Sequence, residues 1–373
     1  MKPVHAAQFR LRGTENDTYL QLNPNPNTAA PASDVPLTPS VWKKLIAEYQ
    51  KPSLPKAIWQ IVNTLVPYAA TWALIYWSLS VSYWLTAGFI VLLGLLTVRT
   101  FIIFHDCCHG SFFESQRACQ IVGYITGMLT FTPYGQWRWE HNVHHASSGH
   151  LDKRGTGDVW MMTIREYLEA SRWKRFAYRL ARNPFILFCI GPLYLFLIWQ
   201  RFPNSNVSEK DRRSAHWMNL GIALMTVGMS FIFGFWTYLL LVVCVMFVAG
   251  GAGVWMFYVQ HQYEGVYWER ADEWDYTAAA LQGSSFYKLP RILQWFTGNI
   301  GFHHIHHLSP RIANYNLERC HNEISIFQQV KPITLLGSLK SLGYRFWDED
   351  RQEMVGYKGL REFIRRQQAQ PTA

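Results

Sequence analysis

Two long apolar blocks without a charged side chain dominate the pattern of this chain. Neither residues 57–98 nor residues 214–263 contain Asp, Glu, Lys or Arg. Each block is long enough for two helices of about 20 residues, the length that crosses the hydrocarbon core of a bilayer. We expect turns within the blocks at Ser78 to Tyr83 and at Gly234 to Trp236. The pattern predicts an all-α membrane protein with four transmembrane helices in two hairpins, over about 57–78, 83–104, 215–234 and 236–258.

The polar segments beside these blocks indicate the topology. Lys43, Lys44, Lys51 and Lys56 precede the first block, and residues 201–213 before the second block are rich in Arg. The turns inside the blocks contain neither Lys nor Arg. Because cytoplasmic loops carry the excess of these residues, we expect both termini in the cytoplasm.

The same pattern divides the chain into three parts. Residues 1–38 are polar and rich in Pro and Asn, and we expect them to form a mobile N-terminal tail. Residues 39–350 are expected to form a single membrane domain, followed by a C-terminal tail over residues 351–373.

Composition supports a membrane location and limits the partners. Charged residues make up 16% of the chain, below the roughly 25% of soluble domains. The six cysteines have no spacing typical of secreted frameworks, so we expect reduced thiols. The net charge of +10 includes a basic loop over 138–182, which fits anionic headgroups or an acidic redox partner. Nothing resembles a nucleic-acid reading module, so nucleic acid is not an expected partner.

Eight of the fourteen histidines form three clusters with the spacing of metal ligands on a helix. Side chains at i, i+3 and i+4, or at i and i+4, share one face. The clusters are His105 and His109; His141, His144 and His145; and His303, His306 and His307. As ordinary hydrogen-bonding histidines, all eight would need separate explanations, so we favour a metal site. Eight imidazoles exceed what one ion of about four to six ligands can use, which indicates two ions and redox or oxygen chemistry.

A shared metal site also constrains two shorter apolar stretches, about 118–137 and 183–200. If either crossed the membrane alone, the three clusters could not face the same side. Both stretches are interrupted by Gly and Pro. We therefore expect two interfacial helices, and a cytoplasmic helical cap that carries the metal site.

The three clusters, their order and the two pairs of spans resemble the integral-membrane fatty acid desaturases. Gly298 to Ile312 and His141 to Trp160 are similar to the acyl-lipid branch of that family, and the likeness covers roughly residues 40–350. The resemblance implies a di-iron centre ligated by the eight clustered histidines. In related enzymes a further ligand follows the last span, where His261 stands here. A hydrogen-bonded interfacial histidine is the alternative interpretation of His261.

Further residues are candidates for supporting roles. His304 lies about 100° from His303 around a helix, but its i+3 relation to His307 keeps it as a possible extra ligand. Aspartates near the clusters are candidate acceptors for ligand N–H groups. They are Asp106, Asp152 and Asp158. The i, i+3 spacing of Asp106 and His109 suggests a hydrogen bond between these two residues.

Small and aromatic residues of the last span are candidates for lining an acyl-chain tunnel. They are Gly250, Gly253, Trp255 and Tyr258. Helix packing through small residues is the alternative interpretation of this group.

The resemblance implies an oxidoreductase that introduces a cis double bond into the acyl chain of a membrane lipid. It implies two Fe ions, O2 as co-substrate and two external electrons. No side chain can break an unactivated C–H bond as an acid or base, so a metal-bound oxidant is required. We find no haem, flavin or nucleotide fingerprint, so a separate ferredoxin or cytochrome b5 is the expected electron donor.

Three alternatives remain at this level. A related membrane di-iron hydroxylase or oxygenase, acting on an alkyl or carotenoid substrate, would share the metals. A histidine-rich metal transporter predicts polar residues within the spans, which contain no charge. A non-catalytic lipid sensor would not need the metals at all. The position of the double bond is not encoded by any residue type.

Overall fold

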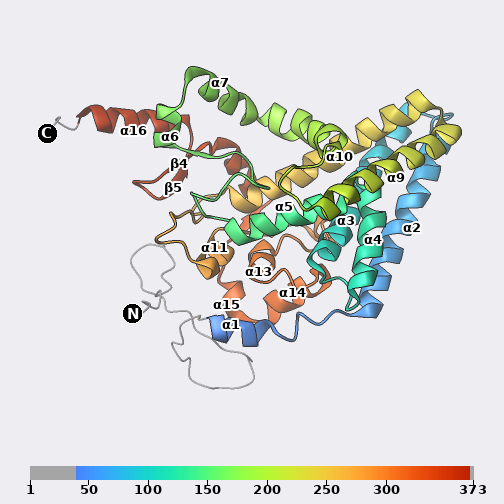
Figure 1. Cartoon of the computed structure of the whole chain (residues 1–373), viewed down its shortest axis with the longest axis horizontal. Coiled ribbons are helices and arrows are strands. Elements are labelled where there is room, and N and C mark those ends of the chain that lie inside the picture. The colour runs from blue at the N-terminus through green and yellow to red at the C-terminus, as the bar shows by residue number, and fades with distance from the viewer. Residues whose placement is uncertain (1–38, 370–373) are drawn as a thin grey trace.

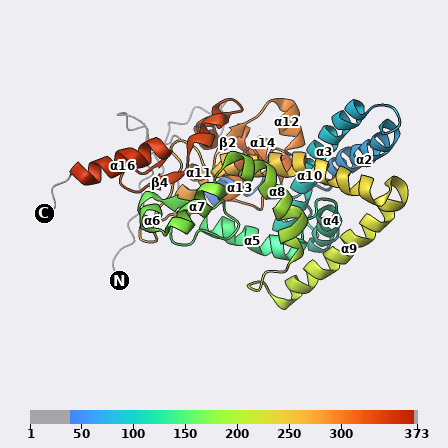
Figure 2. The same ribbon diagram turned by 90° about the horizontal axis from the view of Figure 1, so that it is seen from above.

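Four long helices form one end of the molecule in a computed structural model that describes residues 39–369. All four are long and apolar enough to cross a membrane, which confirms the all-α membrane fold. Figures 1 and 2 show them together at one end, while α16 (Tyr357–Ala369) projects from the other. The expected N-terminal tail, 1–38, lies outside the described residues. The long helices are α2 (Leu54–Ser78), α3 (Tyr83–His109), α9 (Glu209–Phe233) and α10 (Phe235–His261).

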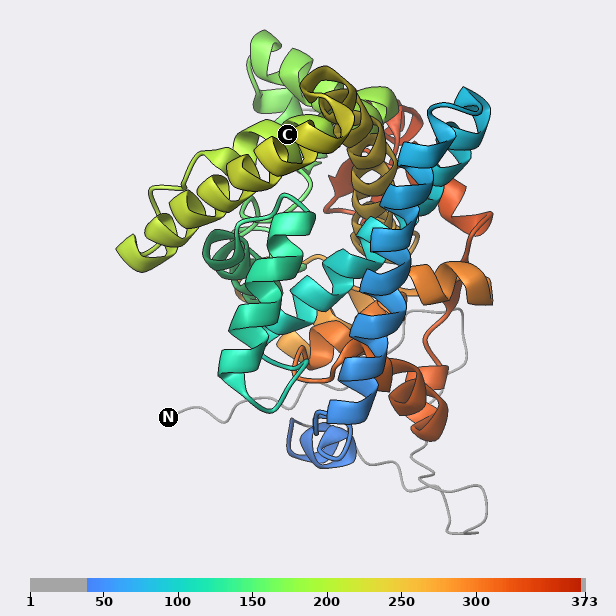
Figure 3. The ribbon, with the colours of Figure 1, turned by 90° about the vertical axis from the view of Figure 1, so that its right-hand side faces the viewer.

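The two expected hairpins are present, and their helices are longer than the apolar blocks alone predict. Gly234 separates α9 from α10 with a φ of 78°, a conformation that glycine adopts without steric cost. The helix α3 packs between α2 and α10, whereas α9 leans away from α2 (Figure 3). Both α3 and α10 end on a histidine, His109 and His261. The spans therefore deliver metal-ligand candidates directly from their ends.

The stretch expected as one interfacial helix over 118–137 is instead two helices, α4 (Gln116–Leu129) and α5 (Tyr134–Ser147). The chain turns at Phe131, which has a φ of 56°. Pro133 follows, and proline restricts the residue before it to extended conformations. This break lets α5 run across the end of α3 and carry the second histidine cluster there.

The second short apolar stretch is helical but irregular. The helix α7 (Arg172–Ala181) and the segment Ile186–Arg201 meet at an angle of 63°. Pro184 stands at the break, where it cannot continue helical hydrogen bonding. The segment consists of η1 (Ile186–Ile190), α8 (Gly191–Leu193), η2 (Tyr194–Ile198) and η3 (Trp199–Arg201).

The remaining chain forms a cap of short helices and two small sheets that the sequence analysis does not predict. One sheet has the order β1-β4-β5, and β2 pairs with β3 in parallel. The strands are β1 (Met162–Thr163), β2 (Phe286–Lys288), β3 (Pro332–Thr334), β4 (Phe346–Asp348) and β5 (Glu353–Val355). The helices are α1 (Pro39–Ile46), α6 (Ile164–Glu169), α11 (Tyr276–Gln282), α12 (Arg291–Phe296), α13 (His303–Leu308), α14 (Asn314–Glu323), α15 (Ser325–Gln328) and η4 (Gly337–Gly343).

Two packing features of the cap bear on function. Residues 351–369, within the expected C-terminal tail, include β5 and α16, which bury Val355, Leu360 and Phe363 in a core shared with α6 and α7. The short helix α13 is held by Ile305 and Leu308 in the largest core of the cap. The third histidine cluster is therefore fixed inside the protein.

Candidate metal centre

Four helices bring nine histidines together. The C-terminal ends of α3 and α10 supply three of them, and α5 and α13 supply the other six. The histidines form two groups. In the first group each residue offers one candidate ligand atom, and these atoms all lie within 4.8 Å of one another. The first group is His105, His109, His141, His145 and His306. Candidate ligand atoms of His144, His261 and His307 also lie within 4.8 Å of one another. We add His303 to this second group because its Nε2 lies close to that of His261.

The ring nitrogens face one another at short distances. In the first group, Nε2 of His145 lies 3.1 Å from Nε2 of His141 and 3.0 Å from Nε2 of His306. In the second group, Nε2 of His261 lies 3.2 Å from Nε2 of His144 and 3.0 Å from Nε2 of His303. In each group one Nε2 atom, of His145 or of His261, thus lies close to the Nε2 atoms of two other histidines.

The two groups are neighbours and share both H-x-x-H-H clusters. The rings of His145 and His307 stack with centroids 4.2 Å apart. On α5 the i and i+4 histidines belong to the first group and the i+3 histidine, His144, belongs to the second. On α13 the assignment is reversed: the i+3 histidine, His306, belongs to the first group, and the i and i+4 histidines belong to the second. Each of the two helices therefore reaches both groups.

Acceptors orient several rings from behind. Nδ1 of His105 lies 2.9 Å from Oδ1 of Asp106, and Nδ1 of His144 lies 2.6 Å from Oδ1 of Asp158. Nδ1 of His261 lies 3.2 Å from the carbonyl oxygen of Gly283. An acceptor at Nδ1 fixes the tautomer that leaves Nε2 free for a metal.

Asp106 lies beside a candidate ligand as expected, but beside a different one, and Asp152 lies apart from both groups. Asp106 bonds to His105 rather than to His109, because its second oxygen is held by the backbone and side-chain N–H groups of Asn314 at 2.6 and 2.8 Å. Asp152 does not reach either group. It is exposed, pairs with Arg270 and accepts the backbone N–H of Ala271.

Burial keeps five of the imidazoles outside the spans neutral. It is the largest cause that lowers the pKa of His141, His145, His303, His306 and His307 well below the ordinary value, and neighbouring imidazoles lower it further. Neutral imidazole is the form that binds metal ions. The arrangement is therefore ready to accept a cation at neutral pH.

His304 lies apart from both groups, as its position on the helix predicts. Its ring is completely buried against Phe286, His321 and Phe327. Burial lowers the pKa of His304 to about 3. The structure does not bring this possible extra ligand to the nine histidines.

Two aromatic neighbours and one amide were missed by the sequence analysis. Trp137 stacks on His141 with centroids 4.3 Å apart, and Phe257 lies 5.1 Å from His261. Each stands four residues before its histidine, a spacing that places both on one helix face and could have revealed them. Asn314, which holds Asp106, is 208 residues distant in sequence and has no local signal.

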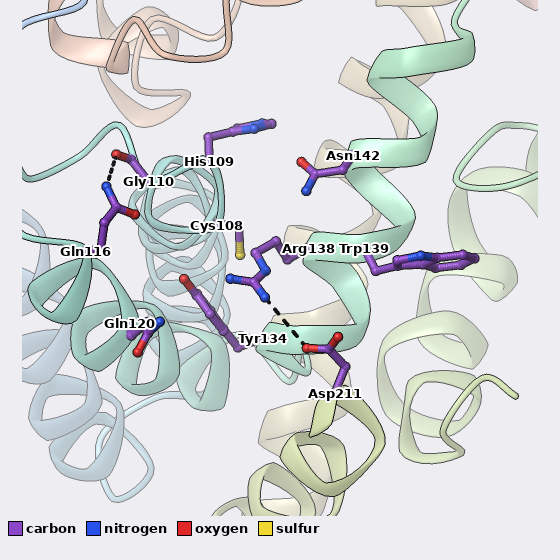
Figure 4. A pocket seen from close by; sticks show the side chains of 10 residues that line it. All are labelled: Cys108, His109, Gly110, Gln116, Gln120, Tyr134, Arg138, Trp139, Asn142 and Asp211. Carbon is purple, nitrogen blue, oxygen red and sulfur yellow. Dashed lines mark hydrogen bonds and ion pairs between the residues drawn. The ribbon is translucent and has the colours of Figure 1, made fainter. Parts of the chain in front are cut away.

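A polar cavity of about 320 Å³ borders the first group. Figure 4 shows His109 and Asn142 at one side of it, and an ion pair of 3.7 Å between Arg138 and Asp211 at the other. The cavity is lined by Cys108, His109, Gly110, Gln116, Gln120, Tyr134, Arg138, Trp139, Asn142 and Asp211.

The expected tunnel residues lie elsewhere. A Cβ on Gly250 would meet Pro192 of α8 at 2.8 Å, and Gly253 has no atom within 4 Å of such a position. Trp255 donates to the hydroxyl of Tyr287 (3.3 Å), and the hydroxyl of Tyr258 donates to the Ser341 carbonyl (2.9 Å). None of the four lines the cavity beside the first group. The acyl-chain tunnel stays a prediction.

The fold and the site together define an integral membrane protein with a buried, histidine-rich candidate metal centre. The family model for fatty acid desaturase matches residues 82–329. The chain belongs to the fatty acid desaturase family, and is thus an oxidoreductase that acts on acyl chains.

Curated relatives agree with this assignment. The chain is 47% identical over 318 residues to a fatty acid desaturase of Bacillus subtilis, which covers 85% of this chain and 90% of the relative. It is 26% identical over 276 residues to an sn-1 acyl-lipid omega-3 desaturase (ferredoxin) of Synechocystis, and the match covers 69% of this chain and 68% of the relative. It is also 27% identical over 315 residues to a temperature-sensitive sn-2 acyl-lipid omega-3 desaturase (ferredoxin) of Arabidopsis thaliana, with 76% and 67% covered.

Proposed function

We propose that this chain introduces a cis double bond into acyl chains of membrane lipids, with two iron ions, O2 and two electrons from a separate protein. The observation that carries the proposal is the convergence of nine histidines into two adjacent groups at the ends of membrane helices. The family assignment supplies the reaction class, and the acyl-lipid names of two relatives support a lipid-bound substrate.

The donor set fits two transition-metal ions. Ligand nitrogens about 2.0–2.1 Å from an ion and at right angles to each other are about 3 Å apart, and the Nε2 pairs lie at 3.0–3.2 Å. Burial lowers the pKa of His141, His145, His303, His306 and His307, which keeps these imidazoles neutral. Imidazole binds Zn, Cu and Fe alike. Desaturation requires a redox-active ion, which excludes zinc, and the resemblance to the di-iron desaturases favours iron over copper.

Each group would hold one ion. His105, His109, His141, His145 and His306 would hold the first, and His144, His261, His303 and His307 the second. Bound iron would supply the oxidising power for breaking unactivated C–H bonds.

The surrounding residues position these ligands and shield them. Asp106, Asp158 and the Gly283 carbonyl orient the rings of His105, His144 and His261. Trp137 and Phe257 cover His141 and His261 with apolar surface, which limits the access of bulk water.

We further propose that both termini and the metal site face the cytoplasm. Lys43, Lys44 and Lys51 precede α2, and Lys56 lies in its first turn. Because α2 and α3 form a hairpin, this end of α2 lies beside the end of α3 that carries His105 and His109. The positive-inside rule favours this orientation. A ferredoxin is the proposed electron donor, since two relatives carry that word in their names; a cytochrome b5 is the alternative.

Lipid analysis of a host that expresses the chain tests the reaction. Gas chromatography with mass spectrometry of membrane fatty acids should show a new unsaturated species with the native chain and none with His144→Ala or His306→Ala. His216→Ala is the matched control, because His216 is exposed on α9 far from both groups in sequence. A hydroxylated lipid without an unsaturated product would instead identify a hydroxylase.

A further inference from the structure

The helix α7 presents an apolar stripe away from the protein. Trp173, Phe176 and Leu180 have the i, i+3 and i+7 spacing of one helix face, and they are 81%, 59% and 48% exposed. Tyr178, on the other side of the helix, is fully buried against Tyr167 and Phe346. Figure 1 shows α7 at the periphery of the molecule. The stripe therefore has no partner within the described residues.

Basic side chains flank the stripe. At about 100° per residue, Lys174 lies about 100° from Trp173 on one side of the stripe. On the other side Arg172 lies about 40° and Arg175 about 100° from Phe176. No Asp or Glu occurs from residue 170 to residue 208. Within residues 39–369 these three cations form no ion pair. The surface thus combines exposed apolar area with unneutralised positive charge.

The orientation of α7 is fixed at its C-terminal end. Arg182 is fully buried and donates to Oε1 of Gln262 (2.8 Å) and to the carbonyl of Tyr344 (3.0 Å). Beyond it the chain bends by 63° into Ile186–Arg201, where Ile190, Tyr194 and Ile198 are also exposed. The stripe of α7 is thus followed directly by a second exposed apolar surface.

Charge excludes α7 from the hydrocarbon core, where Arg and Lys are costly. A helix with large aromatic residues on one face and cations beside them is typical of helices that lie in the plane of the membrane interface. An acidic protein would match the cations, but it would leave the apolar continuity with Ile186–Arg201 unexplained. The observations favour a lipid surface.

We propose that α7 lies in the bilayer interface and binds anionic phospholipid. Trp173, Phe176 and Leu180 insert among the acyl chains, and Arg172, Lys174 and Arg175 contact the phosphate groups. Clusters of basic residues at a membrane surface attract anionic lipids. This binding requires the membrane-embedded fold but neither the metal ions nor the desaturation reaction.

Bromine-labelled lipids test the proposal through tryptophan fluorescence. The full-length protein is reconstituted in equimolar vesicles of phosphatidylcholine and phosphatidylglycerol, with bromine on the acyl chains of only one lipid at a time. The contribution of Trp173 is the difference in quenching between the native chain and Trp173→Phe. We expect this contribution to be larger with brominated phosphatidylglycerol than with brominated phosphatidylcholine.

The triple variant Arg172→Gln, Lys174→Gln, Arg175→Gln should lose that preference. The matched control removes three exposed charges from α16 through Lys358→Gln, Arg361→Gln and Arg365→Gln, and it should keep the preference. Equal quenching by the two lipids in the native chain would overturn the anionic specificity. No quenching of Trp173 by either lipid would overturn the interfacial placement, as expected if an acidic protein covers α7. Because the readout involves no turnover, an inactive enzyme would not affect it.

Discussion

The Nδ1 atom of His144 lies 2.6 Å from Oδ1 of Asp158, and the other carboxylate oxygen accepts the backbone N–H of Gly155 at 3.1 Å. Asp158 therefore connects the loop after α5 with the second histidine group. The contact holds the ring of His144 so that its Nε2 faces Nε2 of His261, 3.2 Å away. A carboxylate in this position also makes the imidazole a better metal ligand.

Replacing this carboxylate should weaken metal binding in the second group. Asp158→Asn is expected to lower the metal affinity of that group by about 10–100-fold, because an amide can present its NH2 group to His144. The measurement is iron retained by the purified protein during titration with a chelator. Asp152→Asn is the control, since Asp152 pairs with Arg270 at the surface, and its iron retention should equal that of the native chain. Equal retention by Asp158→Asn would show that the carboxylate does not support the site.

Two adjacent histidines should behave in opposite ways. The ring of His304 packs against Phe286, His321 and Phe327, apart from both groups, so His304→Leu should retain iron. His303→Leu removes a ring whose Nε2 is 3.0 Å from that of His261, and it should lose iron. Elemental mass spectrometry of both variants checks this. Loss of iron in His304→Leu would place His304 among the ligands.

The metal-free protein should lose stability as the pH falls. Burial lowers the native pKa of His141, His145, His303, His306 and His307 well below 6.5. Below pH 6.5 the histidines of the unfolded chain bind protons, whereas those of the native state do not. The free energy of unfolding therefore decreases as the pH falls below 6.5. Each such histidine contributes up to about 1.4 kcal/mol per pH unit. Above pH 6.5 the contribution is complete and constant.

Thermal unfolding of chelator-treated protein from about pH 7.5 to 5.5 measures this dependence. His304→Leu should reduce the slope, because the pKa of His304 is about 3 in the native state. An unfolding temperature that does not change over this range would contradict the assignment of buried neutral imidazoles.

Close packing between α3 and α10 should depend on Gly94. A Cβ at this position would meet the Val248 side chain at 2.6 Å, so Gly94→Ala should destabilise the protein by about 1–3 kcal/mol. Gly88, on the same helix, has no atom within 4 Å of a Cβ, and Gly88→Ala should be neutral or stabilising. Unfolding temperatures in detergent compare the two variants. Equal unfolding temperatures of Gly94→Ala and Gly88→Ala would mean that close packing of α3 against α10 does not contribute to stability.

The features that the sequence predicts correctly are those encoded locally. Hydropathy is a property of consecutive residues, so residues 57–98 and 214–263 reveal the four spans and both hairpin turns. The i, i+3, i+4 spacing of His303, His306 and His307 places them on one face before any tertiary structure is known.

The remaining features depend on contacts that are distant in sequence. The division of each cluster between two groups follows from how α5 and α13 face each other, so spacing alone could not assign His144 and His306. The bond between Asp106 and Asn314 joins residues 208 positions apart. The positive φ of Phe131 divides one expected helix into two, although phenylalanine is not a residue that predicts such a turn.

The iron content of the purified chain shows whether the two histidine groups each hold one ion. Elemental mass spectrometry should find two iron ions per native chain. It should find one after His109→Ala with His141→Ala, which removes ligands of the first group only, and one after His261→Ala with His303→Ala, which removes ligands of the second. A folded native chain that binds no iron, or paired variants that still hold two ions, would contradict the account.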